Sequence, residues 1–229
     1  YQARKNGKFL GEAFQEEIRR LNLFDEALVE STDEHYLYSQ FCKSKIEWVP
    51  FMLKNNLALP DGTFKYDVIY VASDNNYNQL SAKWFMEEVY PLLSKDIRIC
   101  IIGRITKFIE DKENIQKIPF APSLEDYYKH SKIVMCPMLK GTGVKVKVAE
   151  AYSFGLPIVC NERGVDGLPN KTDNGCMVTN DSVKFAENIH LLLNDEAVYN
   201  EYKRESQKMF LNSFDQEKCY QKLDEIFGV

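Results

Sequence analysis

The sequence predicts an α/β fold in which helices cover both faces of a parallel β-sheet. From Asp67 onward, short apolar runs alternate with longer segments whose apolar residues recur at helical spacing. The short runs are apolar throughout, whereas a strand with one face in water would alternate apolar and polar residues. Strands of this kind, separated by helices, are typical of sheets whose parallel strands are joined by helical crossovers.

The short runs that we expect to be strands are rich in β-branched and other apolar residues. They are residues 67–72 (DVIYVA), 97–102 (IRICII), 133–136 (IVMC) and 157–160 (PIVC). Gly103 directly follows the second run and Pro137 follows the third, and both residue types end regular structure.

The helices expected between and after these strands span residues 79–93, 123–130, 144–154, 181–193 and 214–227. Ser123 and Asp181 are residues that favour the N-cap position, where a side-chain oxygen accepts a hydrogen bond from a free backbone N–H. Gly155 follows the third helix at the position where a left-handed residue is preferred.

The first part of the chain has a different organisation. We expect a helix at 9–23, a strand at 27–30, a helix at 32–41 and a strand at 45–49. Two strands are too few to form a stable sheet of their own. We therefore interpret residues 1–55 as the tail of a preceding domain, 56–66 as a linker rich in turn formers, and 67–229 as a ligand-binding domain.

Composition excludes several classes of protein. Hydrophobic residues make up 45% of the chain and charged residues 28%, as in a globular domain. The net charge of −5 argues against general nucleic-acid binding. No apolar run approaches the roughly 20 residues that span a bilayer. Because the chain begins with Tyr1 rather than methionine, we expect it to be a piece of a longer protein.

The six cysteines do not indicate a metal site or a disulfide framework. None belongs to a C-x-x-C pair, and no histidine lies at ligand spacing from any of them. Cys100, Cys136 and Cys160 lie in the expected strands, which favours buried reduced thiols in a cytoplasmic protein.

The segment 137–159 (PMLKGTGVKVKVAEAYSFGLPIV) carries the strongest functional signal. Gly141 and Gly143 allow the backbone to approach a ligand, and a helix starting at Val144 would present free N–H groups and its positive dipole end. Lys145 and Lys147 add charge, so the segment suits a diphosphate. The alternative is an ordinary solvated face. Because residues two apart on a helix are about 200° apart, only one lysine is expected to face a ligand from within the helix.

Glu150 lies further along the same helix, between Ala149 and Ala151. These small neighbours allow the helix to pack closely on a sheet. A carboxylate in this place could accept hydrogen bonds from the two hydroxyls of a ribose, as acidic residues do in dinucleotide-binding folds. The alternative is an ordinary exposed helix glutamate.

The segment 141–159, followed by GVDGLP at 164–169 and GCMV at 175–178, resembles the C-terminal domain of group 1 glycosyltransferases. The segment 68–93 (VIYVASDNNYNQLSAKWFMEEVYPLL) is similar to the first strand, loop and helix of that domain. The resemblance implies a Rossmann-like domain that forms the C-terminal half of a GT-B fold. It also implies a retaining enzyme that uses a nucleotide sugar.

The resemblance implies roles for several residues of this loop and helix. Glu150 matches the second acid of the family's E-x7-E motif and would bind the ribose, whereas Thr142 stands where the first acid would contact the donor sugar. In family members that read G-x-G-x-K-x-K, as here, Gly143 and Val144 would donate backbone N–H groups to the diphosphate, with Lys147 close by.

Further donor contacts are expected on two other loops. The loop after the first strand (SDNN, 73–76) lacks the basic residues of the family, and Arg104 and Lys107 could supply that charge. Two solvated loop cations are an equally good interpretation. The stretch 120–123, which begins with Phe120, would hold the nucleotide base through backbone contacts.

The resemblance also implies partners. The donor would be a UDP- or GDP-linked sugar. The acceptor would be a saccharide or lipid-linked molecule held by a missing N-terminal domain, as in polysaccharide or glycolipid synthesis. We expect no metal at the donor site, because no D-x-D motif is present. We also expect no cofactor beyond the donor substrate and no binding of nucleic acid.

A cytoplasmic enzyme is expected, with any peripheral membrane contact made by the missing domain. Residues 1–229 alone would bind donor without transferring sugar. The alternatives are a GT-B-fold nucleotide-sugar epimerase and a non-catalytic α/β ligand-binding module, for instance flavodoxin-like.

Overall fold

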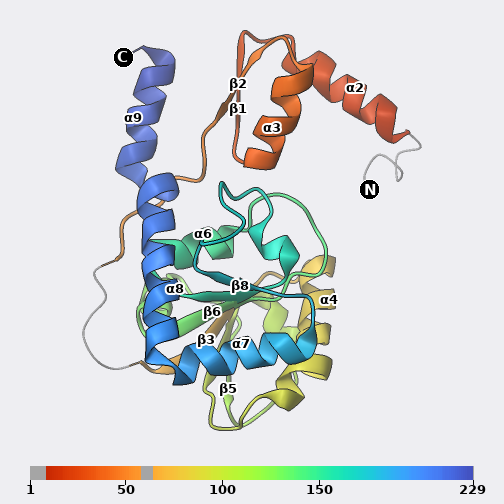
Figure 1. Ribbon diagram of the computed structural model, residues 1–229. Coiled ribbons are helices and arrows are strands. Elements are labelled where there is room, and N and C mark those ends of the chain that lie inside the picture. The colour runs from red at the N-terminus through yellow and green to blue at the C-terminus, as the bar shows by residue number, and fades with distance from the viewer. Residues whose placement is uncertain (1–8, 58–63, 229) are drawn as a thin grey trace.

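The computed structural model describes residues 9–57 and 64–228. Its main body is a six-stranded sheet in the order β5-β4-β3-β6-β7-β8, and every neighbouring pair of strands is parallel (Figure 1). The strands are β3 (Tyr66–Val71), β4 (Ile99–Ile102), β5 (Ile115–Ile118), β6 (Ser131–Cys136), β7 (Ile158–Cys160) and β8 (Cys176–Val178).

The strand order places a topological switch point between β3 and β6. The chain starts at the centre with β3, moves outward to β4 and β5, and returns to β6 on the other side of β3. It then moves outward to β7 and β8. Loops leaving β3 and β6 therefore diverge to opposite faces of the sheet, and ligands of open α/β sheets bind in the resulting crevice at the carboxyl ends of the strands.

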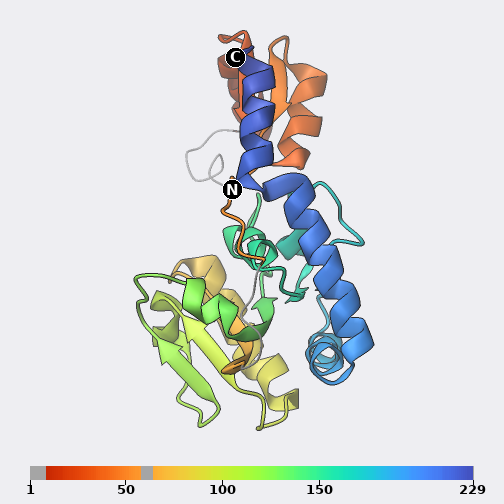
Figure 2. The same ribbon diagram turned by 90° about the vertical axis from the view of Figure 1, so that its left-hand side faces the viewer.

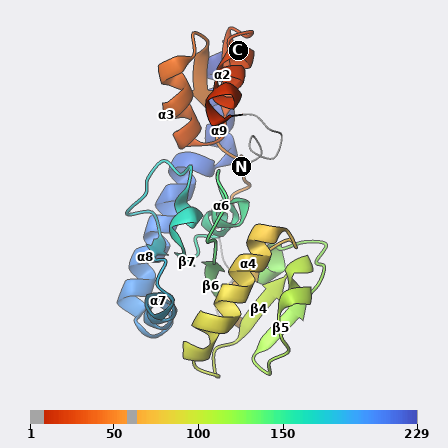
Figure 3. The same cartoon turned by 90° about the vertical axis from the view of Figure 1, so that its right-hand side faces the viewer.

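Helices cover both faces of this sheet (Figure 3). They are α4 (Asn76–Trp84), α5 (Glu125–Lys129), α6 (Val146–Ser153), α7 (Ser182–Asn194) and α8 (Glu196–Met209). On one face, Tyr70 packs in a buried cluster with apolar residues of α4 and α7. On the other, Ile69 packs with residues of α5, α6 and the end of α8. Because successive residues of β3 point to opposite faces, one strand supplies both cores.

Residues 10–48 form a small αβαβ unit, here called the N-terminal unit, which lies beyond the carboxyl ends of the main strands (Figure 1). Its elements are α2 (Leu10–Leu21), β1 (Glu26–Val29), α3 (Thr32–Phe41) and β2 (Lys45–Trp48). The strands β1 and β2 pair in parallel as a two-stranded sheet. Asp33 accepts a hydrogen bond from the N–H of Gly167, 2.7 Å away, which connects α3 to the loop after β7.

The last helix, α9 (Gln216–Phe227), extends from the main body and lies beside the N-terminal unit (Figure 2). Lys222 donates a hydrogen bond to the carbonyl of Trp48, and its ammonium lies 5.0 Å from the centroid of the Trp48 ring. Two segments of the chain run between the main body and the N-terminal unit, one through Leu53 and one through Phe214. Where they meet, the N–H of Leu53 donates a hydrogen bond to the carbonyl of Phe214, and the N–H of Gln216 donates one to the carbonyl of Leu53.

The parallel sheet with helices on both faces confirms the predicted fold class. Two strands of the main sheet, β5 and β8, were not predicted, and neither was α8. β5 reads IQKI, with two polar residues, because it is an edge strand, and β8 has only three residues. These segments are too polar or too short to stand out as buried strands.

The predicted helix 79–93 was wrong at its start and in its regularity. Asn75 caps α4, so the helix begins at Asn76. It continues as a π-helical turn (Phe85–Val89) and then as a 3-10 turn (Tyr90–Leu92) that contains a proline. The helix predicted at 123–130 is shorter, from Glu125 to Lys129, with Leu124 at its N-cap.

The division into a tail, a linker and a ligand-binding domain stays a prediction, and residues 1–8 and 58–63 of it lie outside the described residues. All six cysteines lie in the described part, and all are free thiols; five of them are buried. Across residues 9–57 and 64–228, none of the helices has the length and apolar character that crossing a bilayer requires.

Candidate functional site

The loop from Pro137 to Lys145 connects β6 to α6 at the switch point. Gly141 and Gly143 have φ angles of 107° and 76°, which side chains with a Cβ adopt only with strain. The shape of the loop therefore requires glycine at both positions. α6 begins at Val146 rather than at the predicted Val144, and Lys145 occupies its N-cap with extended backbone and no side-chain capping bond. The first N–H groups of α6 thus remain available to a ligand.

Lys147 reaches across the switch point. Its ammonium donates a hydrogen bond to Oδ1 of Asn78 on α4, at 3.3 Å, and lies 5.2 Å from the centroid of the Tyr70 ring of β3. Asn78 is itself fixed by bonds from its amide to the carbonyl and hydroxyl of Ser73, at 3.0 and 3.1 Å. Burial lowers the pKa of Lys147. The side chain is thus a partly desolvated cation held at the switch point.

Lys145 points elsewhere. It is only 6% exposed, and its ammonium donates a 2.6 Å hydrogen bond to the carbonyl of Gly143. Burial lowers the pKa of Lys145 as well. Lys145 therefore braces the glycine loop, whereas Lys147 extends toward α4. Only one of the two lysines faces the switch point, as expected, but the reason differs: Lys145 is the extended N-cap residue and lies outside the helix.

Glu150 lies one turn after Lys147 on α6 and is partly buried. Its Oε2 accepts a hydrogen bond from the hydroxyl of Tyr128, on α5, at 3.0 Å. Burial raises the pKa of Glu150, and the Tyr128 hydrogen bond and the charge of Lys147 oppose that rise. The interpretation as an ordinary exposed helix glutamate is therefore wrong.

The remaining predicted residues of this loop lie close to α6. Thr142 is exposed between the two glycines. Val144 is partly buried, and its Cγ2 lies 2.7 Å from the point where a Cβ on Gly167 would be. Val144 therefore touches the loop that also contacts the N-terminal unit.

Arg104, Lys107 and Phe120 lie at the carboxyl ends of β4 and β5, on the same edge of the sheet. Arg104 forms an ion pair with Asp74, at 3.3 Å, and both Arg104 and Lys107 are exposed. Phe120 is 80% exposed. Within residues 9–57 and 64–228, these three side chains form no hydrogen bond or ion pair with α6, so the shared sheet edge is what they have in common with Lys147 and Glu150.

Asn78 and Tyr128 complete the surroundings of Lys147 and Glu150, and sequence reasoning missed both. Asn78 lies in the polar run SDNNYNQ, where an asparagine is expected to cap or turn. Tyr128 lies in a short helix, where an aromatic residue is expected to fill the core. The hydroxyl of Tyr128 needs a partner because the residue is buried, and burial is known only from the structure, so the sequence held no signal for it.

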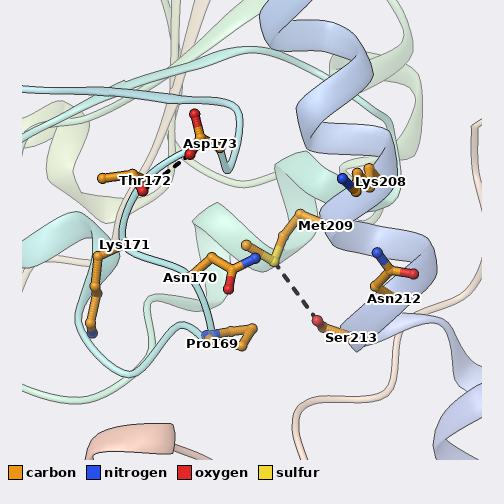
Figure 4. A pocket seen from close by; sticks show the side chains of 9 residues that line it. All are labelled: Pro169, Asn170, Lys171, Thr172, Asp173, Lys208, Met209, Asn212 and Ser213. Atoms are coloured by element: carbon orange, nitrogen blue, oxygen red, sulfur yellow. Dashed lines mark hydrogen bonds between the residues drawn. The ribbon is translucent and has the colours of Figure 1, made fainter.

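The pocket drawn in Figure 4 lies elsewhere, between the loop 169–173 and the junction of α8 with the following π-helical turn. Its volume is about 380 Å³. Lys171 at its rim donates to the carbonyl of Val165 and forms an ion pair with Asp33.

Within the described ranges, no three His, Cys, Asp or Glu residues are grouped so that they could hold a metal ion.

Solved structures share the fold of this chain. The chain matches a mutant of TarM from S. aureus, in complex with fondaparinux, alpha-GlcNAc-glycerol and UDP, with a TM-score of 0.74 and 17% identity. That match covers 98% of this chain and 48% of TarM. Alr3699/HepE from Anabaena, in complex with UDP and glucose, matches with a TM-score of 0.71 and 13% identity over 96% of this chain and 67% of that one. The Rossmann-like fold is thus that of solved glycosyltransferase structures.

Curated relatives match part of their own length. An uncharacterised 44.6 kDa protein of the cps region of Klebsiella pneumoniae is 27% identical over 150 residues, which is 55% of this chain and 39% of the relative. An uncharacterised glycosyltransferase of Haemophilus influenzae is 26% identical over 160 residues, 64% of this chain and 44% of the relative. The chain therefore spans less than half the length of these relatives.

A family model described as "Glycosyl transferases group 1" matches residues 65–195. This range is more than half of the chain, and it contains β3 to β8, the glycine loop and α6. The chain belongs to the group 1 glycosyl transferases.

Proposed function

We propose that this chain is the donor-binding part of a glycosyltransferase that moves a sugar from a UDP- or GDP-linked donor to a saccharide or lipid-linked acceptor. One observation carries the proposal. The switch point brings together a glycine loop, the start of α6, a partly desolvated Lys147 and a half-buried Glu150. A diphosphate and a ribose require donors and acceptors of these kinds, in this order along a helix.

In this proposal the diphosphate lies on the backbone of the glycine loop, and Lys147 supplies a full positive charge. Negative charge builds on the leaving diphosphate as the glycosidic bond breaks, so a cation that is already in place stabilises the transition state more than the ground state. Glu150 accepts hydrogen bonds from the ribose hydroxyls, and the loop that begins at Phe120 holds the base. Thr142 contacts the donor sugar without a carboxylate.

The comparisons support a nucleotide-sugar donor. TarM and HepE were solved with UDP, and HepE also with glucose. The Klebsiella relative comes from a cps region, which supports a role in polysaccharide synthesis. The acceptor would bind to a part of the protein that residues 1–229 do not contain, as the greater length of the relatives suggests. We propose a cytoplasmic enzyme, in which any peripheral membrane contact belongs to that part.

Thermal stabilisation by nucleotides tests the proposal. At about 100 times its dissociation constant, a nucleoside diphosphate should stabilise the fold by about 2.7 kcal/mol. In a chain of this size, each kcal/mol raises the melting temperature by roughly 2–4 °C. UDP, GDP, ADP and their sugars are compared by differential scanning fluorimetry. Indifference to all of them would favour a non-catalytic α/β module, and turnover of a nucleotide sugar without acceptor would favour an epimerase.

The donor site is proposed to act without a metal ion or a cofactor, because the helix start and Lys147 already supply positive charge to the diphosphate. EDTA should leave the dissociation constant of UDP or GDP unchanged in isothermal titration calorimetry. A strict requirement for Mg²⁺ or Mn²⁺ would contradict this part of the proposal. In the same preparation, radiolabelled donor should bind without transfer to saccharide or lipid acceptors.

A further inference from the structure

Tyr128 donates a hydrogen bond to one oxygen of Glu150 from a site with no access to solvent. The residue is 1% exposed, and its ring stacks on Phe154 with centroids 5.0 Å apart and an interplanar angle of 15°. The phenol is therefore held in two ways: its backbone belongs to α5, and the ring of Phe154 packs on its face. A donor held so rigidly fixes the position of whatever accepts its hydrogen bond.

The two oxygens of Glu150 have different surroundings. Oε2 accepts the Tyr128 hydrogen bond at 3.0 Å. Oε1 accepts no hydrogen bond from residues 9–57 and 64–228. A fully buried oxygen of those residues without a partner would stand beside the Tyr70 hydroxyl as unsatisfied, and Oε1 does not, so it reaches solvent. Glu150 thus has one oxygen anchored by a buried phenol and one oxygen that reaches solvent.

We propose that Tyr128 is a positioning residue, which anchors Oε2 of Glu150 so that the carboxylate meets the hydroxyls of a ribose in a fixed orientation. The inference rests on the proposed function, because it assigns Glu150 to the ribose. A carboxylate has about four acceptor sites, so Oε2 can accept from Tyr128 and still share a ribose hydroxyl with Oε1. Without the anchor, Glu150 would have to lose side-chain freedom on binding.

The anchor also favours the ionised form of Glu150. Burial raises the pKa of this carboxyl, and the hydrogen bond from Tyr128 lowers it. A protonated carboxyl would present one donor and fewer acceptors to the ribose. Removing the phenol O–H should therefore raise the pKa of Glu150 further, and ribose recognition should fail at a higher pH.

Tyr128→Phe tests the inference, because it keeps the ring and its stacking and removes only the O–H. Tyr152→Phe is the matched control: Tyr152 is equally buried, lies on α6, and its hydroxyl is paired with Sγ of Cys176 at 3.0 Å. The first measurement uses the ligand-free protein. NMR titration of 13C-labelled glutamate carboxyls should show a raised pKa for Glu150 in Tyr128→Phe and an unchanged pKa in Tyr152→Phe. An unchanged pKa in Tyr128→Phe would overturn the anchor.

The second measurement is the ratio of affinities for UDP and 2′-deoxy-UDP, and for GDP and 2′-deoxy-GDP, by isothermal titration calorimetry. The ribose preference should fall roughly three- to tenfold in Tyr128→Phe, the loss expected for a weakened charge-assisted contact. It should stay constant in Tyr152→Phe. In a Glu150→Gln background, Tyr128→Phe should cause no further loss, because it acts through the carboxylate. A further loss of the same size there would overturn the inference.

A third measurement needs no variant, in case Tyr128→Phe does not fold. The ribose preference of the unchanged protein should fall as the pH is lowered through the titration of Glu150. A constant preference would overturn the inference while leaving diphosphate binding, and with it the proposed function, intact. Absence of any binding of UDP or GDP would instead overturn the proposed function, and the role of Tyr128 toward a ribose with it.

Discussion

The carboxyl edge of the sheet has two sides that differ in how they hold their polar groups. After β6, Lys147 and Glu150 are partly buried and bonded to Asn78 and Tyr128. After β4, Arg104 is exposed and forms a single ion pair with Asp74. Both sides carry charged residues at the same edge, but only the β6 side fixes them through buried partners.

This difference bears on how much each side can contribute to binding. A charge that is already partly desolvated and held in place loses little hydration and little side-chain freedom when a ligand arrives. An exposed cation must give up both, and its field is screened by water and salt. We therefore expect the β6 side to dominate nucleotide affinity and the β4 side to adjust it.

Lys147→Ala should have the largest effect. A charge-assisted contact to a phosphate contributes about 1.5–3 kcal/mol, so UDP or GDP affinity should fall roughly 10- to 100-fold. The free nucleoside should lose far less, because it lacks the diphosphate. Calorimetry with both ligands measures the two losses. Lys140→Ala is the control, since Lys140 is an exposed lysine of the same loop. Equal losses for nucleotide and nucleoside would remove Lys147 from the phosphate site.

Glu150→Gln should have the next largest effect. An amide keeps one acceptor oxygen and loses the charge, so ribonucleotide affinity should fall by about 1–2 kcal/mol. The 2′-deoxy nucleotides should be affected less. Fluorescence or calorimetric titration of each pair of ligands gives the comparison. If the ribo and deoxy forms lose affinity in step, Glu150 is not the ribose ligand.

An alkaline pH titration sharpens the same comparison. The lowered pKa of Lys147 means that its charge is lost at a lower pH than that of an ordinary lysine, which titrates at about 10.4. Diphosphate affinity should therefore hold around neutral pH and fall as the pH rises through the lowered pKa of Lys147. Lys147→Ala should flatten this part of the curve, and Arg104→Ala should leave it in place. A curve that Lys147→Ala does not alter would assign the titration to another group.

Arg104→Ala and Lys107→Ala should have the smallest effects. Interactions of exposed cations are weak, so each substitution should reduce UDP or GDP affinity less than about fivefold, and the loss should shrink further as salt is added. Titrations at low and high ionic strength measure it. A loss as large as that of Lys147→Ala would break the distinction between the two sides of the edge.

The sequence predicted the interior strands and the glycine loop, because these depend on local patterns. The end of α6 was also predicted, and Gly155 after it has the expected left-handed φ of 64°. The sequence did not predict the edge strands β5 and β8, since an edge strand can be polar or short and still pair. The buried partners of the site could not be predicted either. Asn78 is 69 residues from Lys147, and only the return of the chain from β5 to β6 brings them together.

The two segments that cross between the main body and the N-terminal unit are bonded to each other at Leu53, Phe214 and Gln216. As a result, a unit that is compact in space is assembled from both ends of the described chain, residues 10–48 and α9. A truncation that starts at residue 64 would keep the whole sheet yet leave α9 without the Trp48 surface that Lys222 covers. Expression boundaries for the part of the chain that contains the main sheet should therefore follow these contacts rather than a single cut in the sequence.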